Sequence, residues 1–397
     1  MNVEQIKNIE DLIELDAGSK IKSHTVKRLT APGENYGSLI LSVDISVQTP
    51  NGDEEVHAVA KMVPPNKFIQ EVFNTQVTFR NEIGFFRNIV PVLQNFQREH
   101  GVKKVTNFAA KYYGSRLNLN KDESIVDDDA ALVVENLKSK GYDTLDRIAG
   151  LDLDAAKLVI INLAELHAVP IALKLQKPDV FENEVKKYLS TWKIPDRMAQ
   201  QMREDQIRLA EEIEELRPLK ERILAAFDSA TNEPSKKCEP FATIAHNDCW
   251  SNNNMFKKEG NKVVKSKMVD FQILDYGSPA KDVVFFIFSS VKNEVVKDHY
   301  DELVKLYYDT FISDLKELHC DVTPFTWEAL LEEIDYVMTH SEFRHLGFMM
   351  LPIYAPKGAV QELDVLTPES MRHETITEVQ KEKYAFTYTE FAKSGWI

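Results

Sequence analysis

The segment HNDCWSNNNMF, residues 246–256, contains side chains of the types that phosphoryl transfer uses. His246, Asp248 and Asn253 have the spacing H-x-D-x4-N, which is that of a phosphotransferase catalytic loop. A carboxylate such as that of Asp248 can orient a hydroxyl group that attacks a γ-phosphate, and an amide oxygen about one loop turn later can help to hold magnesium. A polar loop can contain these residues by chance, so the motif alone is a weak indication.

The residues after this motif predict a second carboxylate at the same place. Residues 254–257 and 263–269 have strand character and are separated by a glycine-containing turn. Such a hairpin would return the chain to Asp270, which would bind magnesium on the phosphates. We therefore predict Asp248 as the catalytic residue, and Asn253 and Asp270 as the metal ligands.

Upstream segments contain candidates for holding the nucleotide. Gly33, Gly37 and Ser38 belong to a glycine-containing segment whose backbone N–H groups can approach phosphate oxygens, although a plain turn is the alternative. Lys61 ends the apolar run AVAK, and Glu82 lies on the inward face of the next predicted helix. An ion pair between them would hold the lysine against the α- and β-phosphates. The alternative is an exposed lysine and an ordinary helical glutamate.

The elements that must position these residues begin with a hairpin and a helix. Two apolar runs, residues 37–47 and 56–63, flank Asn51-Gly52, the strongest short hairpin signal. They predict an antiparallel pair of strands. Residues 67–86 then predict a helix with one apolar face, which we expect to end before Pro91.

Further along the chain the pattern changes from strands to helices. Strand candidates at residues 111–117 and 131–137 bracket an acidic segment that we expect at a solvated hairpin tip. The nearly apolar residues 158–166 predict a buried central helix. Because 397 residues exceed the usual limit of about 250–300 for one core, we predict an α+β chain with two lobes. These are a small antiparallel-sheet lobe over residues 1–135 and a mainly helical lobe over residues 136–397, with a helical insertion at about 170–235.

Composition excludes several classes of function. The net charge is −15 and no block of Lys and Arg occurs, which argues against a nucleic-acid or anionic-membrane partner. The N-terminus lacks the apolar core of a signal peptide, and no run approaches the ~20 apolar residues of a membrane span. The three cysteines lack CxxC spacing, which is typical of a reduced compartment. We expect a cytoplasmic monomer.

Other candidate residues favour structural roles. Cys249 lies inside the opening motif, but no surrounding pattern supports a nucleophile. Asp282 precedes an apolar helix start, and we expect it to brace the catalytic-loop backbone or to cap that helix. His167 and His345 are expected in packing or on the surface, and residues 343–354 in the core rather than at a ligand site.

A resemblance to a known family emerges from these motifs. HNDCWSNNNMF and MVDFQILDYGSPAKDVVFFIFSS resemble the signature of the ecdysteroid kinase-like family, within the aminoglycoside phosphotransferase and choline kinase group. GENYGS, AVAKMVP, FRNEIGFF, VVENL and LAELHA extend the likeness over about residues 26–350. It implies a protein kinase-like fold and phosphorylation of a small-molecule hydroxyl by ATP and Mg²⁺, the acceptor being an ecdysteroid, another steroid or a xenobiotic.

The resemblance also implies roles for single residues. Lys61 and Glu82 match the family's phosphate-anchoring pair, and Glu135 to Leu137 match the hinge that holds adenine through backbone groups. One departure is Asn247, where the family has glycine. A left-handed backbone accepts Asn more readily than most residues.

Two alternative functions are weighed against this one. A protein kinase would carry a long activation segment, but only 11 residues separate Asp270 from Asp282. We therefore expect a small-molecule acceptor, with a pocket formed by the helical insertion and the C-terminal helices. The second alternative is a catalytically silent steroid- or xenobiotic-binding protein on a kinase-like scaffold. The presence of Lys61, Asp248 and Asn253 argues against it.

Overall fold

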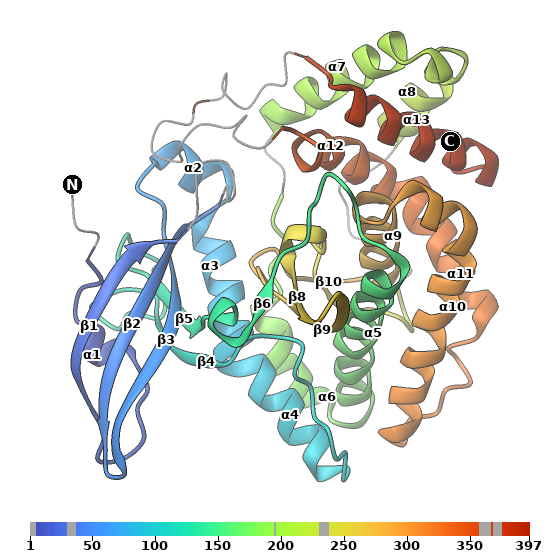
Figure 1. The fold of residues 1–397 in the computed structure, drawn as a ribbon. Coiled ribbons are helices and arrows are strands. Elements are labelled where there is room, and N and C mark those ends of the chain that lie inside the picture. Colours follow the sequence, from blue (N-terminus) through green and yellow to red (C-terminus); the bar gives the residue numbers. More distant parts are fainter. Residues whose placement is uncertain (1–4, 30–36, 194–195, 230–237, 357–366, 368–374) are drawn as a thin grey trace.

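The protein has the predicted α+β, two-lobed, protein kinase-like fold (Figure 1). The computed structural model describes residues 5–29, 37–193, 196–229, 238–356, 367 and 375–397. A small lobe built on an antiparallel sheet precedes a larger, mainly helical lobe. The candidate catalytic residues are contributed by both lobes.

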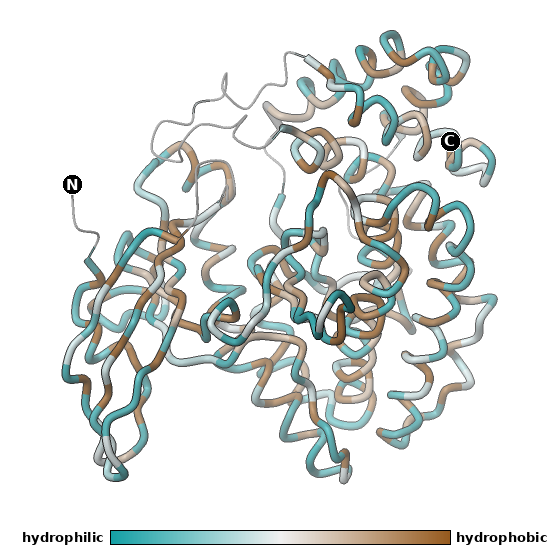
Figure 2. The backbone as a smooth tube through the Cα atoms, in the orientation of Figure 1, coloured by the Kyte–Doolittle hydropathy of each residue, from teal (hydrophilic) through white to brown (hydrophobic). Residues whose placement is uncertain are grey.

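The sheet of the small lobe has five antiparallel strands in the order β1-β2-β3-β5-β4. The predicted hairpin around Asn51-Gly52 is present, and Leu41, Val43 and Ile45 alternate inward from it. This alternation is visible along the strands in Figure 2. The first strand was not predicted from the sequence, because KIKSHTVKR is an edge strand with mostly exposed, polar side chains. The strands are β1 (Lys20–Arg28), β2 (Leu39–Thr49), β3 (Gly52–Met62), β4 (Tyr112–Arg116) and β5 (Ala131–Glu135).

We predicted one helix over residues 67–86 that ends before Pro91. The structure instead has a break within this range, and the helical chain continues past Pro91. The chain breaks at Asn74, which has a left-handed φ of 45°. It then passes Pro91 through a π-helical turn, Phe85–Ile89. Proline lacks an N–H and displaces a carbonyl of the preceding turn, and the wider π turn accommodates it. The helices of this lobe are α1 (Ile9–Leu12), α2 (Lys67–Val72), α3 (Thr75–Gly84) and α4 (Val90–Glu99).

The acidic segment between β4 and β5 is the predicted solvated hairpin tip, because the two strands pair antiparallel and residues 120–125 are exposed. Arg87 Nη2 lies 2.9 Å from Glu123 Oε2, and Lys67 Nζ lies 2.7 Å from Asp128 Oδ1. Val126 is buried between them in sequence. Basic side chains on α2 and the π turn therefore hold the segment against the lobe.

The large lobe is organised around α5 (Leu153–Gln176), which is the predicted buried central helix. It packs along α10 (Asn293–Glu317) and against α9 (Pro279–Ser290). Among the described residues, α5 is the one helix long and apolar enough to cross a membrane by length and composition. However, 67% of its apolar window is buried inside the protein, as expected for a core helix.

Four of the remaining helices, α7, α8, α12 and α13, lie together at one end of this lobe (Figure 1). Gln206, buried on α7, donates to Gly347 O at 3.1 Å and accepts from Tyr388 Oη at 2.5 Å. The residues 343–354 contribute to the core as predicted. The four helices are α7 (Asp196–Glu212), α8 (Lys220–Ser229), α12 (Phe343–Ile353) and α13 (Glu378–Ser394), and the lobe also contains α6 (Pro178–Val180) and α11 (Trp327–Val337).

Short strands in the large lobe bring two loops together. The predicted hairpin consists of β8 (Asn254–Glu259) and β9 (Lys262–Met268), and β6 (Tyr142–Asp143) pairs with β8. β7 (Thr243–Ala245) pairs with β10 (Asp275–Gly277). The loop after β7 therefore lies beside the loop after β9, which contains Asp270.

Candidate active site

Asp282 braces the backbone of the loop that follows β7. Its Oδ2 accepts the N–H of His246 at 2.6 Å, and its Oδ1 accepts the N–H of Asn247 at 2.7 Å. His167 Nε2 lies 3.0 Å from the same carboxylate, and all four partners are protected from solvent or nearly so. Ser278, not Asp282, caps α9. Of the two structural roles predicted for Asp282, bracing is the observed one.

This brace holds Asn247 in a left-handed conformation, with φ 61°. Asn is among the residues that tolerate this region best, which explains how it replaces the glycine of the resembling sequences. Its Nδ2 donates to Ile273 O at 3.0 Å, on the segment after Asp270. Asn247 therefore links the two loops through its side chain.

His246 ties the same two loops from the buried side. The N–H of Asp248 donates to His246 Nδ1 at 3.3 Å, so the ring proton is placed on Nε2, which donates to Val269 O at 3.3 Å. Burial lowers the pKa of His246, so the ring is neutral. Both ring nitrogens are engaged by backbone groups of the two loops, so His246 positions these loops.

Asp248 presents one fixed and one unengaged carboxylate oxygen. Asn253 Nδ2 donates to Asp248 Oδ2 and to Asp248 O, each at 2.8 Å. Oδ1 is shielded from solvent and has no hydrogen-bond partner among the described residues. Burial, and then the nearby charge of Asp270, raise the pKa of Asp248 well above its usual value. Such a carboxylate can accept a hydrogen bond, and then a proton, from a hydroxyl group.

Lys61 joins this site from the small lobe. Its ammonium lies 2.7 Å from Glu82 Oε2, which is the predicted ion pair, and 2.7 Å from Asp270 Oδ1. Burial on its own would lower the pKa of Lys61, but the carboxylates of Asp270 and Glu82 outweigh it and hold the pKa above its usual value. The lysine is therefore charged. Glu82 Oε1 also accepts the N–H of Phe271 at 3.1 Å, which ties α3 to the Asp270 loop.

Asp270 is held in a strained backbone conformation. Its φ is 67°, a region that costs energy for residues other than glycine. The bonds on either side maintain it, because Val269 N–H donates to Asn253 O at 2.9 Å and Phe271 N–H donates to Glu82. Phe271 also stacks on Phe85 with ring centroids 4.0 Å apart. These contacts fix the backbone around Asp270 and tie it to the loop that contains Asn253.

The chemistry of these side chains fits magnesium. Asn253 uses Nδ2 to hold Asp248, which directs its amide oxygen to the other side, and Asp270 offers a carboxylate. Mg²⁺ prefers oxygen ligands and is usually held by one or two protein groups together with phosphate and water. No group of three or more His, Cys, Asp or Glu side chains among the described residues could hold a metal by itself. A site completed by nucleotide phosphates is consistent with this arrangement.

The glycine-containing segment is described only in part. Gly33 lies outside the described residues, whereas Gly37 and Ser38 precede β2. A Cβ on Gly37 would lie 2.9 Å from Gln272 Nε2 and 3.2 Å from Phe73 Cδ1, so a larger residue there would require these side chains to shift. Gly37 thus lies beside Gln272, two residues after Asp270. Phosphate binding by Gly33, Gly37 and Ser38 stays a prediction.

The predicted hinge begins where β5 ends, at Glu135. The N–H of Asn136 donates to His57 O at 3.0 Å, which extends the pairing of β5 with β3. Leu137 is buried against Val134, Met255 and Val269. An apolar cluster at this position suits a planar heterocycle such as adenine. Adenine binding by the hinge stays a prediction.

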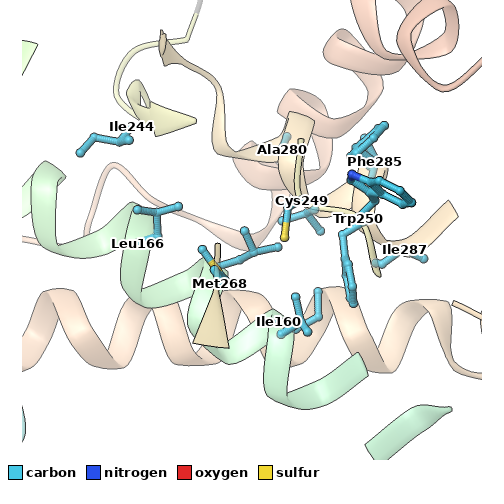
Figure 3. Close-up of a cluster of buried hydrophobic side chains, with 14 of the residues drawn as sticks. Ile160, Leu166, Ile244, Cys249, Trp250, Met268, Ala280, Phe285 and Ile287 are labelled. Atoms are coloured by element: carbon cyan, nitrogen blue, oxygen red, sulfur yellow. The ribbon is translucent and has the colours of Figure 1, made fainter. Parts of the chain in front are cut away.

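Cys249 points away from this site into the core. Figure 3 shows Cys249 and Trp250 among the buried side chains that include Ile160 and Met268. Burial raises the pKa of the Cys249 thiol, so it is protonated and inaccessible. His345 stacks on Phe285 with centroids 4.3 Å apart, as expected for a packing residue.

Asn81 is a positioning residue that the sequence reasoning missed. It is buried on α3 beside Glu82, and its Nδ2 donates to Leu274 O at 3.0 Å and to Ser190 O at 2.8 Å. Its Oδ1 accepts the N–H of Ser190 at 3.2 Å. The sequence could have indicated this role, because Asn81 is a polar residue next to the inward-facing Glu82, and a buried amide requires hydrogen-bond partners.

The chain is similar to a protein family and to several solved structures. The model of the ecdysteroid kinase-like family matches residues 32–320. Among solved structures, an ethanolamine kinase of Plasmodium vivax is similar at 12% identity and a TM-score of 0.42, covering 94% of this chain and 85% of that chain. The GDP complex of wild-type aminoglycoside 2'-phosphotransferase-IIIa is similar at 11% identity and a TM-score of 0.41, covering 93% and 94%. No curated protein sequence matches.

Proposed function

Because the chain belongs to the ecdysteroid kinase-like family, we propose that it transfers the γ-phosphoryl group of ATP to a hydroxyl group of a small molecule. One observation carries the proposal: the side chains that this chemistry needs meet at one place although they come from distant segments. They are Lys61 of β3, Glu82 of α3, Asp248 and Asn253 of the loop after β7, and Asp270 of the loop after β9.

Asp248 is assigned the role of orienting the acceptor. Asn253 fixes its Oδ2, so Oδ1 is left to accept a hydrogen bond from the attacking hydroxyl. The raised pKa makes the carboxylate a better proton acceptor as the hydroxyl attacks. The hydroxyl proton then resides on Oδ1. The acceptor oxygen bonds to the γ-phosphorus, and the bond from that phosphorus to the β–γ bridging oxygen breaks, so that ADP leaves.

The phosphate groups are assigned to Lys61 and to the metal ligands. Lys61 stays charged and is held by Glu82, so it can place its ammonium against the α- and β-phosphates. Asn253 and Asp270 would hold Mg²⁺, which neutralises phosphate charge when it is bound. Lys61 and Asp270 are in contact, so the predicted phosphate anchor and the predicted metal ligand lie side by side before the nucleotide binds.

A small-molecule acceptor is supported by the short path from Asp270 to α9. The three residues of β10 pair with β7, and α9 follows at Pro279. This leaves no segment long enough to dock a peptide as protein kinases do. We propose an ecdysteroid, another steroid or a xenobiotic as the acceptor, bound on the side of the helical insertion and the C-terminal helices.

The test is ADP release by purified protein with ATP, Mg²⁺ and a panel of hydroxylated steroids and xenobiotics. We expect turnover with at least one acceptor, and its loss in Asp248→Asn while ATP binding persists, because this change removes the acceptor of the hydroxyl proton. Asp53→Asn, at an exposed hairpin end, is the matched control. Equal ADP release by wild type and Asp248→Asn over the whole panel would contradict the proposal, and ATP binding without turnover would favour a silent binding protein.

A further inference from the structure

A cavity of about 360 Å³ lies behind the predicted hinge, apart from Asp248 and the metal ligands. Phe86, Val90 and Pro91 line one side, from the π turn and the start of α4. Asn107 and Lys267 line another side, and Glu135 borders the hinge. Its volume is within the range of small-molecule sites, about 300–1,000 Å³. The lining is half apolar and half polar or charged, so it offers both an apolar wall and hydrogen-bonding groups to a ligand.

Lys267 is the unusual member of this lining. The residue is only 8% exposed, and its ammonium donates to Ala109 O at 2.6 Å and to Asn107 Oδ1 at 2.9 Å. Both acceptors are neutral, and among the described residues no carboxylate oxygen lies within 4.0 Å of this ammonium. A buried cation without an anion in contact is costly, since burial disfavours the charged form. Burial accordingly lowers the pKa of Lys267, with Glu135 opposing at longer range.

The walls around Lys267 are tied in place. Met268 N–H donates to Phe108 O at 2.7 Å, which joins β9 to the segment that carries Asn107. Gln94 Nε2 donates to Thr106 O at 2.9 Å, which joins α4 to the same segment. The cavity is thus formed by hydrogen-bonded elements, and a ligand would meet a prepared site.

We propose that this cavity binds a small molecule with an anionic end, a carboxylate or a phosphate, held by Lys267, and an apolar body that lies against Phe86, Val90 and Pro91. An ammonium has three donors, and two are used by Ala109 and Asn107. The third can be given to the anion, which also supplies the missing counter-charge. The site borders the predicted hinge at Glu135 but contains neither Asp248 nor the predicted metal ligands, and it does not depend on turnover.

The test uses benzoate and phenyl phosphate as probes, with neutral benzamide as the comparison, and calorimetry with and without a non-hydrolysable ATP analogue. We expect at least one anion, and not benzamide, to bind the wild type in both conditions. Lys267→Met should weaken that binding at least about tenfold, the effect of losing one charge-assisted hydrogen bond. Lys265→Met, which removes an exposed charge from the same strand, should not.

A second variant covers the case in which Lys267→Met does not fold. Val90→Phe fills the cavity from α4 and keeps the charge, whereas Val92→Phe adds the same ring on α4 outside the lining. Binding lost in the first and kept in the second supports the site. Absence of anion binding to the wild type, equal binding by Lys267→Met or Val90→Phe, or displacement by the ATP analogue would each overturn it.

Discussion

The ammonium of Lys61 lies 2.7 Å from Oδ1 of Asp270, although 209 positions separate the two residues in the chain. This contact joins the small lobe to the loop that carries a predicted metal ligand. Glu82 completes it, because it binds Lys61 with one oxygen and the N–H of Phe271 with the other. The predicted phosphate anchor and the predicted metal ligand thus belong to one charge network that α3 positions.

Asp270→Asn tests the metal role of this network. The change keeps the shape of the side chain but removes the negative charge, so we expect nucleotide affinity in the presence of Mg²⁺ to fall roughly 10- to 100-fold. Affinity without Mg²⁺ should change much less. Isothermal titration with and without the metal measures both, and Asp53→Asn serves as the control. An equal loss in both conditions would contradict metal binding at Asp270.

Asp282→Ala should destabilise the protein because it leaves the N–H groups of His246 and Asn247 buried without an acceptor. We expect a decrease of about 3–5 kcal/mol in the free energy of unfolding. Asp282→Asn keeps one acceptor oxygen and should cost less. Urea denaturation gives the order, and Ser278→Ala, which removes the α9 cap, should cost only about 1 kcal/mol. If Asp282→Ala lowered the free energy of unfolding no more than Ser278→Ala does, the hydrogen bonds of Asp282 would not be a major source of stability.

Asn247→Gly restores the residue that the resembling sequences carry. Glycine suits φ 61° but loses the bond to Ile273 O, so we expect stability to change by less than about 1 kcal/mol and ADP release to persist. Asn247→Val, which is β-branched at a left-handed position, should destabilise by roughly 1–2 kcal/mol. Thermal unfolding and ADP release separate the two effects. Loss of turnover in a stable Asn247→Gly would instead assign the Asn side chain a direct role.

Lys383 predicts a dependence of stability on pH. It is buried on α13, and its ammonium donates to Val291 O at 2.9 Å and to Asn293 Oδ1 at 3.0 Å. Burial lowers the pKa of Lys383 to about 7, below the usual value of a lysine in the unfolded chain. Between pH 7 and about 10 the unfolded chain binds the extra proton, so stability should rise with pH by up to about 1.4 kcal/mol per pH unit.

The measurement is the free energy of unfolding of wild type and Lys383→Met across this pH range. The difference between the two should shift in favour of the wild type as the pH rises. Lys381→Met, on the same helix but only partly buried and paired with Glu378, should follow the wild type. Parallel curves for wild type and Lys383→Met would rule out titration of this lysine.

Much of the fold could be predicted from local patterns in the sequence. The alternation around Asn51-Gly52 and the strands that follow the H-x-D-x4-N motif depend on neighbours in the chain, and both hairpins form as predicted. The apolar run of residues 158–166 required a buried helix for the same reason. By contrast, β1 has a polar pattern that resembles a loop, and its pairing with β2 is decided by the edge of the sheet.

The sequence by itself determined which side chains could take part in the chemistry, because spacing within one loop sets Asp248 against Asn253. Only the tertiary structure decided that Lys61 contacts Asp270, that α4 continues past Pro91, and that Lys267 is buried without a contacting anion. Contacts between distant segments depend on how the lobes pack, and the environment of a charge depends on all the elements around it. Neither is encoded in the spacing of neighbouring residues.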